Sequence, residues 1–187
     1  KSLMYMKNCL ICKTKYKTFI DFGNMPIANA FATKEELKNE YFFPMKVGFC
    51  KNCKMVQLVE QPSREKMFHE NYAFFSSTSK YMQNHFQKFA KSVQKLQDLN
   101  EKSFVVEIGC NDGIMLQNFV SDNIPCLGIE PSKNVARVSE EKNIKVIIDF
   151  FDDKLANLIL SKYKKADAIL SANVMCHIPY MHSIFAG

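Results

Sequence analysis

The sequence predicts an α/β protein in two parts: a small N-terminal domain held together by cysteines, and a doubly wound parallel sheet. Two C-x-x-C pairs lie within the first 53 residues, and a helix-period apolar stripe follows them. From residue 103 onward, short apolar runs alternate with helical segments. Such alternation builds parallel βαβ units whose sheet is covered on both faces. We therefore expect a ribbon-like domain, a linking helix and a Rossmann-like domain.

The composition is that of a globular chain with a modest positive charge. Of its 187 residues, 47% are apolar and 24% are charged, which excludes disordered and fibrous classes. The net charge of +6 comes from lysines spread along the chain, so we expect no nucleic-acid partner. There is no run of roughly 18 apolar residues and no apolar stretch typical of a signal peptide. We expect a cytoplasmic protein with no membrane partner.

Four of the seven cysteines form two pairs, Cys9 with Cys12 and Cys50 with Cys53. Each pair suits a tight turn with both sulfurs on one side, and two such turns complete a tetrahedral thiolate shell for zinc. Two redox disulfides, or buried cysteines without a metal, are the alternatives. Four thiolates leave no position for water, so we expect structural zinc. Because a segment of about 60 residues is marginally stable alone, metal binding would fold it.

The 37 residues between Cys12 and Cys50 exceed what the shortest zinc ribbons use. We expect a short helix at 33–38 and a turn at Gly23 and Asn24, followed by an irregular stretch at 25–31. The expected strands are the short extended segments 18–21, 45–49 and 55–59.

A brief helix after Pro62 and an aromatic, hydroxyl-rich loop at 72–79 lead into the clearest helix of the chain. The loop offers serine and threonine as N-cap candidates. The apolar residues of the helix are spaced by 4, 3, 4 and 3 positions, and we interpret them as core-facing: Met82, Phe86, Phe89, Val93 and Leu96.

Apolar runs and helical segments then alternate. The predicted strands are 105–108, 126–129, 145–148 and 168–170, and the predicted helices are 114–120, 133–141 and 153–160. We place the domains at 1–70 (zinc-binding), 71–100 (loop and linking helix) and 101–187 (Rossmann-like). Because only four strands are visible, we expect the last domain to be truncated after the fourth.

Glycines and carboxylates gather where the first two predicted strands end. Gly109 and Gly113 permit a tight turn and a close approach of ligand to backbone at the start of a helix. Glu130 lies 23 residues after Glu107, where a carboxylate can accept both hydroxyls of a ribose. A dinucleotide fingerprint would have glycine at the position of Asn111, which disfavours an NAD-dependent oxidoreductase. The polar side chains suit an ammonium and a carboxylate, which favours S-adenosylmethionine.

The segment Glu-Ile-Gly-Cys-Asn-Asp-Gly at 107–113 resembles motif I of class I S-adenosylmethionine-dependent methyltransferases. The whole chain, from the first cysteine pair to Asn-Val-Met-Cys-His-Ile-Pro at 173–179, is similar to the N-terminal half of zinc-containing sugar C-methyltransferases, which act on nucleotide-linked keto-deoxysugars. The four-cysteine domain, the segment Gly-Asn-Met-Pro-Ile-Ala-Asn-Ala-Phe at 23–31 and the loop at 72–79 carry this closer resemblance.

The resemblance implies a set of cofactor contacts at the strand ends. Gly109, Asn111 and Gly113 would line the methionine part of S-adenosylmethionine, and Glu107 would support their loop. Glu130 would hold the ribose.

Further contacts would follow the third and fourth strands. Asp149 and Phe150 would meet the adenine amino group and ring face, and Asn173 would lie beside the sulfonium. Alternative roles remain: Glu107 as a cap of its loop and Phe150 as a core residue.

His177 and Tyr72 are the candidate catalytic residues by this resemblance. His177 would face the substrate and hydrogen-bond the keto oxygen where enolate charge develops. An H-I-P sequence also occurs in class I methyltransferases of other substrates, so that alternative is open. Phe74 stands where the family frequently has a second tyrosine.

The implied reaction is methyl transfer from S-adenosylmethionine, through an enolate, to a carbon of a nucleotide-linked ketosugar. A zinc-ribbon and Rossmann-like binding protein without turnover, or a class I methyltransferase of another substrate, are the alternatives. In the family, the general base is associated with a Tyr-His-Glu-His segment, and by this resemblance that segment would lie beyond Gly187. We therefore expect the 187-residue chain to be inactive by itself.

Overall fold

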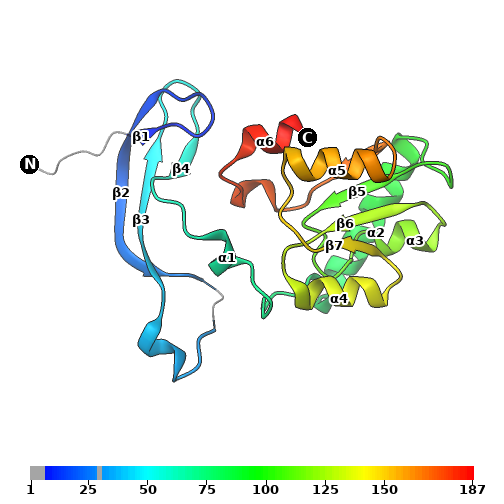
Figure 1. The fold of residues 1–187 in the computed structure, drawn as a ribbon, viewed down its shortest axis with the longest axis horizontal. Coiled ribbons are helices and arrows are strands. Elements are labelled where there is room, and N and C mark those ends of the chain that lie inside the picture. Colours follow the sequence, from blue (N-terminus) through cyan, green and yellow to red (C-terminus); the bar gives the residue numbers. More distant parts are fainter. Residues whose placement is uncertain (1–6, 29–30) are drawn as a thin grey trace, which may run out of the picture. The chain divides into compact units, whose positions relative to one another are not determined.

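The computed structural model describes residues 7–28 and 31–187. Its contacts divide the chain into two compact units. The first comprises the residues up to Met67 together with Pro179–His182, and the second comprises Phe68–Ile178 and Ser183–Gly187. Figure 1 shows an antiparallel sheet in the first and a helix-covered sheet in the second. Residues 29 and 30, in the segment expected to be irregular, lie outside the described residues.

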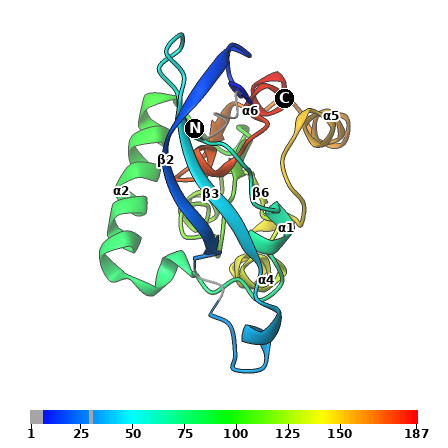
Figure 2. The same cartoon turned by 90° about the vertical axis from the view of Figure 1, so that its left-hand side faces the viewer.

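The first unit contains an antiparallel sheet with strand order β1-β2-β3-β4. The strands are β1 (Lys7–Asn8), β2 (Lys15–Pro26), β3 (Phe42–Phe49) and β4 (Val56–Leu58). Figure 2 shows β2 and β3 running side by side as a long ribbon. Two short helical segments, η1 (Glu36–Asn39) and α1 (Arg64–Met67), lie near the helices expected at 33–38 and after Pro62.

The prediction of a turn at Gly23 and Asn24 is wrong, because strand β2 continues through both residues to Pro26. Asn24 pairs with Pro44 of β3, and the register shifts between Asp21 and Asn24 as in a β-bulge. Gly23 has a φ of +76°, and its N–H donates to Asp21 Oδ1 at 2.9 Å. Turn-forming residues therefore make a bulge here, because the pairing with β3 decides the path of the chain.

The second unit is an α/β fold with a four-stranded parallel sheet, as the sequence predicts. The strand order of this sheet is β7-β6-β5-β8. The strands are β5 (Val105–Ile108), β6 (Cys126–Ile129), β7 (Lys145–Ile147) and β8 (Ala168–Leu170). The helices are α2 (Lys80–Leu96), α3 (Gln117–Ser121), α4 (Lys133–Glu141) and α5 (Asp153–Lys162). Shorter segments are η2 (Ser76–Thr78) and η3 (Met175–His177). Helix α6 (Met181–Ala186) has its first two residues in the first unit and the others in the second.

The order in which the chain adds strands to the sheet reverses direction once, and this reversal determines which face of the sheet each helix covers. The chain moves outward from β5 to β6 to β7 and then crosses back to β8, beside β5. Right-handed crossovers therefore place α3 and α4 on one face of the sheet and α5 on the other, as Figure 1 shows. The carboxyl ends of β5 and β8 flank the point of reversal, where ligands of such sheets bind.

Helix α3 begins at Gln117, three residues later than expected. Asn111 and Gly113 have φ values of +51° and +77°, which keep the loop after β5 out of helical geometry. The first i to i−4 bond runs from Gln117 N–H to Gly113 O at 3.0 Å.

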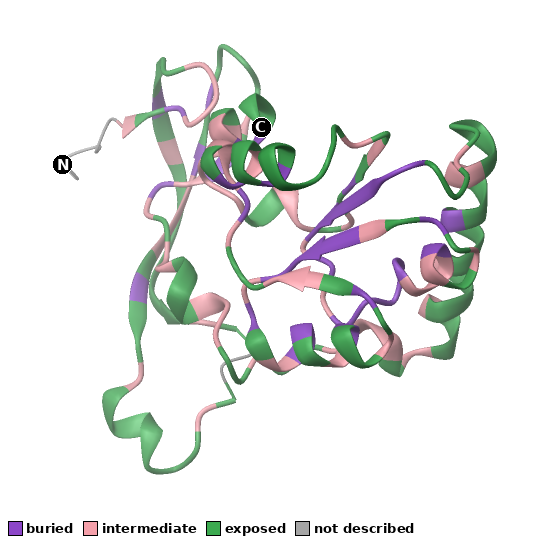
Figure 3. Ribbon diagram, turned by 45° about the vertical axis from the view of Figure 1, so that its right-hand side comes forward, coloured by how far each residue is buried: buried purple, intermediate pink, exposed green. Residues whose placement is uncertain are grey.

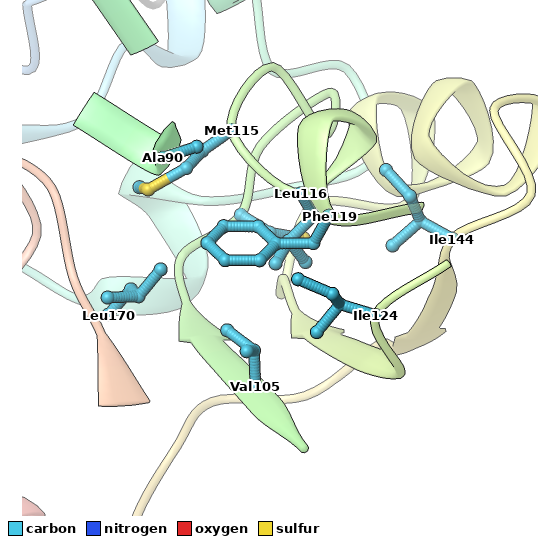
Figure 4. Close-up of a cluster of buried hydrophobic side chains, with 9 residues drawn as sticks. Ala90, Val105, Met115, Leu116, Phe119, Ile124, Ile144 and Leu170 are labelled. Atoms are coloured by element: carbon cyan, nitrogen blue, oxygen red, sulfur yellow. The ribbon is translucent and has the colours of Figure 1, made fainter. Parts of the chain in front are cut away.

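Phe119, fully buried, lies at the centre of the core between the sheet and the helices α2 and α3 (Figure 4). Figure 3 shows that burial is concentrated in β5 and β6. The predicted stripe of α2 is only partly correct: Phe86 and Val93 pack against this core, but Phe89 and Leu96 are 44% and 78% exposed. The fully buried Ala90 makes the close contact instead, so the buried face is narrower than the stripe.

Within the described ranges, no helix combines the length and the apolar character needed to cross a lipid bilayer.

Candidate functional site

The four cysteines of the two C-x-x-C pairs form one cluster. Their sulfurs all lie within 4.8 Å of one another. The Sγ atoms of Cys9 and Cys53 are 3.6 Å apart, and those of Cys12 and Cys50 are 3.4 Å apart. A tetrahedral zinc with Zn–S bonds of about 2.3 Å requires sulfurs about 3.8 Å apart. The cluster therefore fits a zinc ion after small adjustments.

The two cysteine turns share one backbone design. In the first, Lys13 N–H donates to Cys9 O at 3.1 Å, and in the second, Lys54 N–H donates to Cys50 O at 2.8 Å. Lys13 and Lys54 both have left-handed φ values, 61° and 65°. Each turn thus folds back on its first cysteine, and the sulfurs of both turns converge.

Polar side chains around the cluster stabilise negatively charged sulfur. Gln57, in β4, donates from Nε2 to Cys9 Sγ at 3.2 Å and accepts from Leu10 N–H at 2.9 Å. The Thr14 hydroxyl lies 2.9 Å from Cys12 Sγ; its hydrogen bond, followed by those of the Asn52 side chain and the Thr14 main chain, lowers the pKa of that thiol to about 5. No motif or spacing in the sequence identifies Gln57 or Thr14 as neighbours of the cysteines. Their polarity next to a cysteine turn or within a strand was the available signal.

The loop after β5 requires glycine at two positions. Gly109 has a φ of +70°, and a Cβ there would lie 2.4 Å from Val174 Cγ2, so the chain after β8 approaches the loop closely. At Gly113, with a φ of +77°, a Cβ would lie 2.4 Å from Ile144 Cδ1. These two glycines hold the backbone in a turn that side chains would block.

Glu130, directly after β6, fastens this loop to the neighbouring strand. Its carboxylate is 5% exposed; Oε2 accepts from Asn111 N–H at 3.0 Å, and Oε1 accepts from Ser132 N–H at 2.9 Å. Burial raises the pKa of Glu130 despite these bonds. Each carboxylate oxygen has a further lone pair, so the group can still accept hydroxyl hydrogens.

Glu107, at the end of β5, is a buried carboxyl whose Oε2 has no hydrogen-bond partner among the described residues. Burial raises its pKa well above the usual value, and the nearby Glu130 and Asp112 raise it further. An orphaned oxygen in a concentration of carboxylates favours a cationic or donor group of a ligand. The ammonium of S-adenosylmethionine fits this donor set.

The loop at 72–79 is bonded to the loop after β5. Asn111 Oδ1 accepts from Ser76 N–H at 2.9 Å, and its Nδ2 donates to Phe74 O at 3.0 Å. Asp112 Oδ2 accepts from both the N–H and the hydroxyl of Ser77, at 2.8 and 2.6 Å. The side chain of Asn111, expected beside the methionine part of the cofactor, is thus engaged with the loop. Asp112 lies in the motif at 107–113 and Ser77 in the loop at 72–79, but no pattern in the sequence predicts the bonds between them.

Three aromatic site residues expected from the sequence gather around a fourth ring, Phe68. Its ring centroid lies 5.7 Å from Tyr72, 6.4 Å from Phe150 and 6.3 Å from His177. Asn134 of α4 holds the main chain of Tyr72 by bonds of 2.7 and 3.2 Å. Burial, and then the charge of Glu130, raise the pKa of Tyr72. The main chain of Tyr72 is thus fixed to α4, the helix that follows Glu130 in the chain.

Two other expected site residues lie at the edge of this arrangement. Asp149 is exposed, and its Oδ1 accepts from Phe150 N–H at 2.7 Å. Asn173 follows β8 with a φ of +56°, and its side chain is exposed. Among the hydrogen bonds of the described residues, none joins either side chain to Glu130.

A family model described as "Methyltransferase domain" matches residues 80–186, which is more than half of the chain. The chain belongs to this methyltransferase family. The membership implies S-adenosylmethionine as cofactor, which the polar atoms and glycines at the ends of β5 and β6 fit. A second model, described as "Putative zinc binding domain", matches residues 9–68, and together with the four clustered sulfurs it supports zinc.

A curated relative of this methyltransferase is the C-methyltransferase NovU of Streptomyces niveus. The two are 23% identical over 181 residues, which cover 96% of this chain and 43% of NovU. The chain therefore spans less than half of the length of that relative.

We expect Cys50→Ser to abolish the binding of about one zinc per chain. Because zinc-binding free energy is also folding free energy here, the first unit should become sensitive to protease. Elemental analysis and limited proteolysis measure the two effects. Cys176→Ser is the control, since Cys176 is exposed and outside the cluster. Full zinc occupancy in Cys50→Ser would remove Cys50 from the metal site.

We expect Glu107→Gln to change how stability depends on pH. The folded-state pKa of Glu107 is raised above the usual 4.5, so its contribution to stability is present below pH 4.5 and is lost as pH rises through the folded value. The free energy of unfolding of Glu107→Gln relative to wild type should rise with pH, by at most about 1.4 kcal/mol per pH unit.

Urea unfolding at about pH 5 and about pH 8 measures this difference. Glu101→Gln, at an exposed position, is the control. A difference between Glu107→Gln and wild type that is the same at both pH values would contradict the raised pKa.

Proposed function

We propose that this methyltransferase transfers the methyl group of S-adenosylmethionine to a carbon of a nucleotide-linked ketosugar. The observation that carries the proposal is the bonding of the loop at 72–79 to the loop after β5 through Asn111 and Asp112. These bonds join the segment that contains Tyr72 to the cofactor site. The similarity to a C-methyltransferase over 96% of the chain supports carbon as the acceptor. We also propose a role in deoxysugar biosynthesis in the cytoplasm.

The cofactor roles follow from the positions of the carboxylates and glycines. Gly109 and Gly113 would let the methionine part approach the backbone, and the free Oε2 of Glu107 would accept from its ammonium. Glu130 would accept the ribose hydroxyls. Phe150 would contact the adenine, with Asp149 and Asn173 at the border of the pocket. When bound, S-adenosylmethionine supplies an electrophilic methyl group on a sulfonium.

The proposed chemistry at the sugar requires loss of the proton next to the ketone, with the resulting negative charge held on the keto oxygen. His177 is exposed on η3, after β8, and would donate a hydrogen bond to that oxygen. Tyr72, fixed by Asn134, would orient the sugar. Positioning and charge stabilisation of this kind contribute more to such reactions than covalent steps by the protein.

The substrate class is tested by offering the intact protein S-adenosylmethionine with different acceptors. We expect release of S-adenosylhomocysteine with a nucleotide-linked ketosugar, and none with the same sugar reduced at its ketone, because no acidic proton is then present. Turnover of protein, nucleic acid or catechol acceptors instead would overturn the sugar assignment.

We expect Glu130→Ala to weaken the binding of S-adenosylhomocysteine at least about tenfold. Hydrogen bonds to a charged carboxylate are worth roughly 1.5 to 3 kcal/mol, and about 1.4 kcal/mol corresponds to a factor of ten. Calorimetric titration measures the affinity. Glu130→Gln, which keeps an acceptor for Asn111 N–H, separates loss of charge from loss of the loop. Glu141→Ala, an exposed glutamate at the end of α4, should bind as wild type does. Equal affinity of Glu130→Ala and wild type would remove Glu130 from the site.

A further inference from the structure

Phe68 is the shared neighbour of three side chains that come from different parts of the second unit. Its half-buried ring contacts Tyr72, Phe150 and His177 at centroid distances of 5.7 to 6.4 Å. Neither periodicity nor a motif identifies Phe68 in the sequence. Its contacts with residues 82 and 109 positions away along the chain are visible only in the folded structure.

The neighbours of Phe68 place its ring at the carboxyl edge of the parallel sheet. Phe150 follows β7, and His177 lies in η3 after β8. The main chain of Tyr72 is bonded to α4, the helix after β6, and burial, followed by the charge of Glu130 directly after β6, raises the pKa of Tyr72. Ligands of doubly wound sheets bind along this edge. A large apolar side chain that spans it is therefore a candidate wall of the ligand site.

None of the three neighbouring rings stacks in parallel on Phe68, so a flat ring of a ligand could do so. Its plane is inclined by 47° to Tyr72, 69° to Phe150 and 61° to His177, so it is parallel to none of the three. Aromatic side chains stack on the flat faces of nucleobases. Among the described residues, the three ring contacts of Phe68 are all inclined, and a flat heterocycle could add a parallel stack.

We propose that Phe68 forms a wall of the adenosine end of the cofactor site and contacts the adenine ring. This inference rests on the proposed cofactor roles of Glu130 and Phe150. The charged methionine end matches the buried carboxyl of Glu107, whereas the uncharged purine matches an aromatic cluster. Phe68 lies beside the residue expected on the adenine face and beside Tyr72, which is bonded to α4, the helix that follows the ribose carboxylate.

The absence of tryptophan from the chain allows a direct test of this contact. In Phe68→Trp the new indole is the only one, and stacking of adenine on it should quench its fluorescence. We expect quenching on titration with S-adenosylhomocysteine, and also with 5′-methylthioadenosine, which has the adenosine but no amino acid. The half-saturation point should equal the dissociation constant from calorimetry. Phe89→Trp, at a 44% exposed position of α2, is the matched control and should not respond.

A second pair of variants separates contact from structural support. Phe68→Ala should weaken the binding of S-adenosylhomocysteine and of 5′-methylthioadenosine by the same factor, about tenfold, because the lost stack involves only the adenosine that both ligands contain. Phe68→Leu restores apolar volume but no stacking face, so it should recover the melting temperature and not the affinity. Recovery of affinity by Phe68→Leu would assign Phe68 a structural role and overturn the proposal.

The possible outcomes separate failure of the proposed Phe68–adenine contact from failure of the proposed cofactor site. If wild type binds S-adenosylhomocysteine but Phe68→Trp gives no fluorescence change at saturation, the Phe68 contact is refuted and the site stands. If a nucleoside diphosphate quenches Phe68→Trp and S-adenosylhomocysteine does not, the ring belongs to the substrate's base, and the adenine assignment is refuted. If wild type binds neither S-adenosylhomocysteine nor 5′-methylthioadenosine, the cofactor assignment falls, and the Phe68 contact with it.

Discussion

The Glu130 carboxylate is the constraint on which the order of the cofactor edge depends. It is buried, and it accepts backbone N–H groups from Asn111 and Ser132, one from the loop after β5 and one from its own strand's continuation. The bond fixes the main chain of Asn111, whose side chain in turn holds Phe74 and Ser76. One buried acid thus organises two loops that are distant in sequence. Charge-assisted bonds of this kind are short and strong enough to offset part of the cost of burying the charge.

The two units differ in the composition of their buried cores. The second has a contiguous apolar core around Phe119. The buried apolar cluster of the first consists of Cys9, Tyr16, Cys50 and Val59, with Ile11, Cys12 and Met55 packed against it. Three of these seven residues are expected metal ligands. The first unit therefore has a core of which the metal site is a part, whereas the core of the second is made of apolar side chains.

Local patterns in the sequence predicted much of the fold and only part of the site. The four parallel strands, the cysteine turns and the glycines at 109 and 113 follow from spacing and backbone freedom, which are local properties. The bulge at Gly23 depends on β3, and the start of α3 depends on left-handed residues in the preceding loop. Asp112 with Ser77, and Phe68 with His177, are contacts over 35 and 109 residues, and no pattern in one segment encodes them.

The close approach of Gly109 to Val174 limits which residues the segment after β8 can accept. Backbone geometry limits Asn173, whose φ of +56° favours asparagine or glycine, and volume limits Val174, which fills the space a side chain at 109 would need. Cys176 and His177 are exposed, but the His177 ring contacts Phe68, whereas the Cys176 thiol lies 3.7 Å from Asn173 Oδ1. A mutant library directed at this segment should therefore keep Asn173, Val174 and His177 and randomise Cys176, whose side chain is exposed.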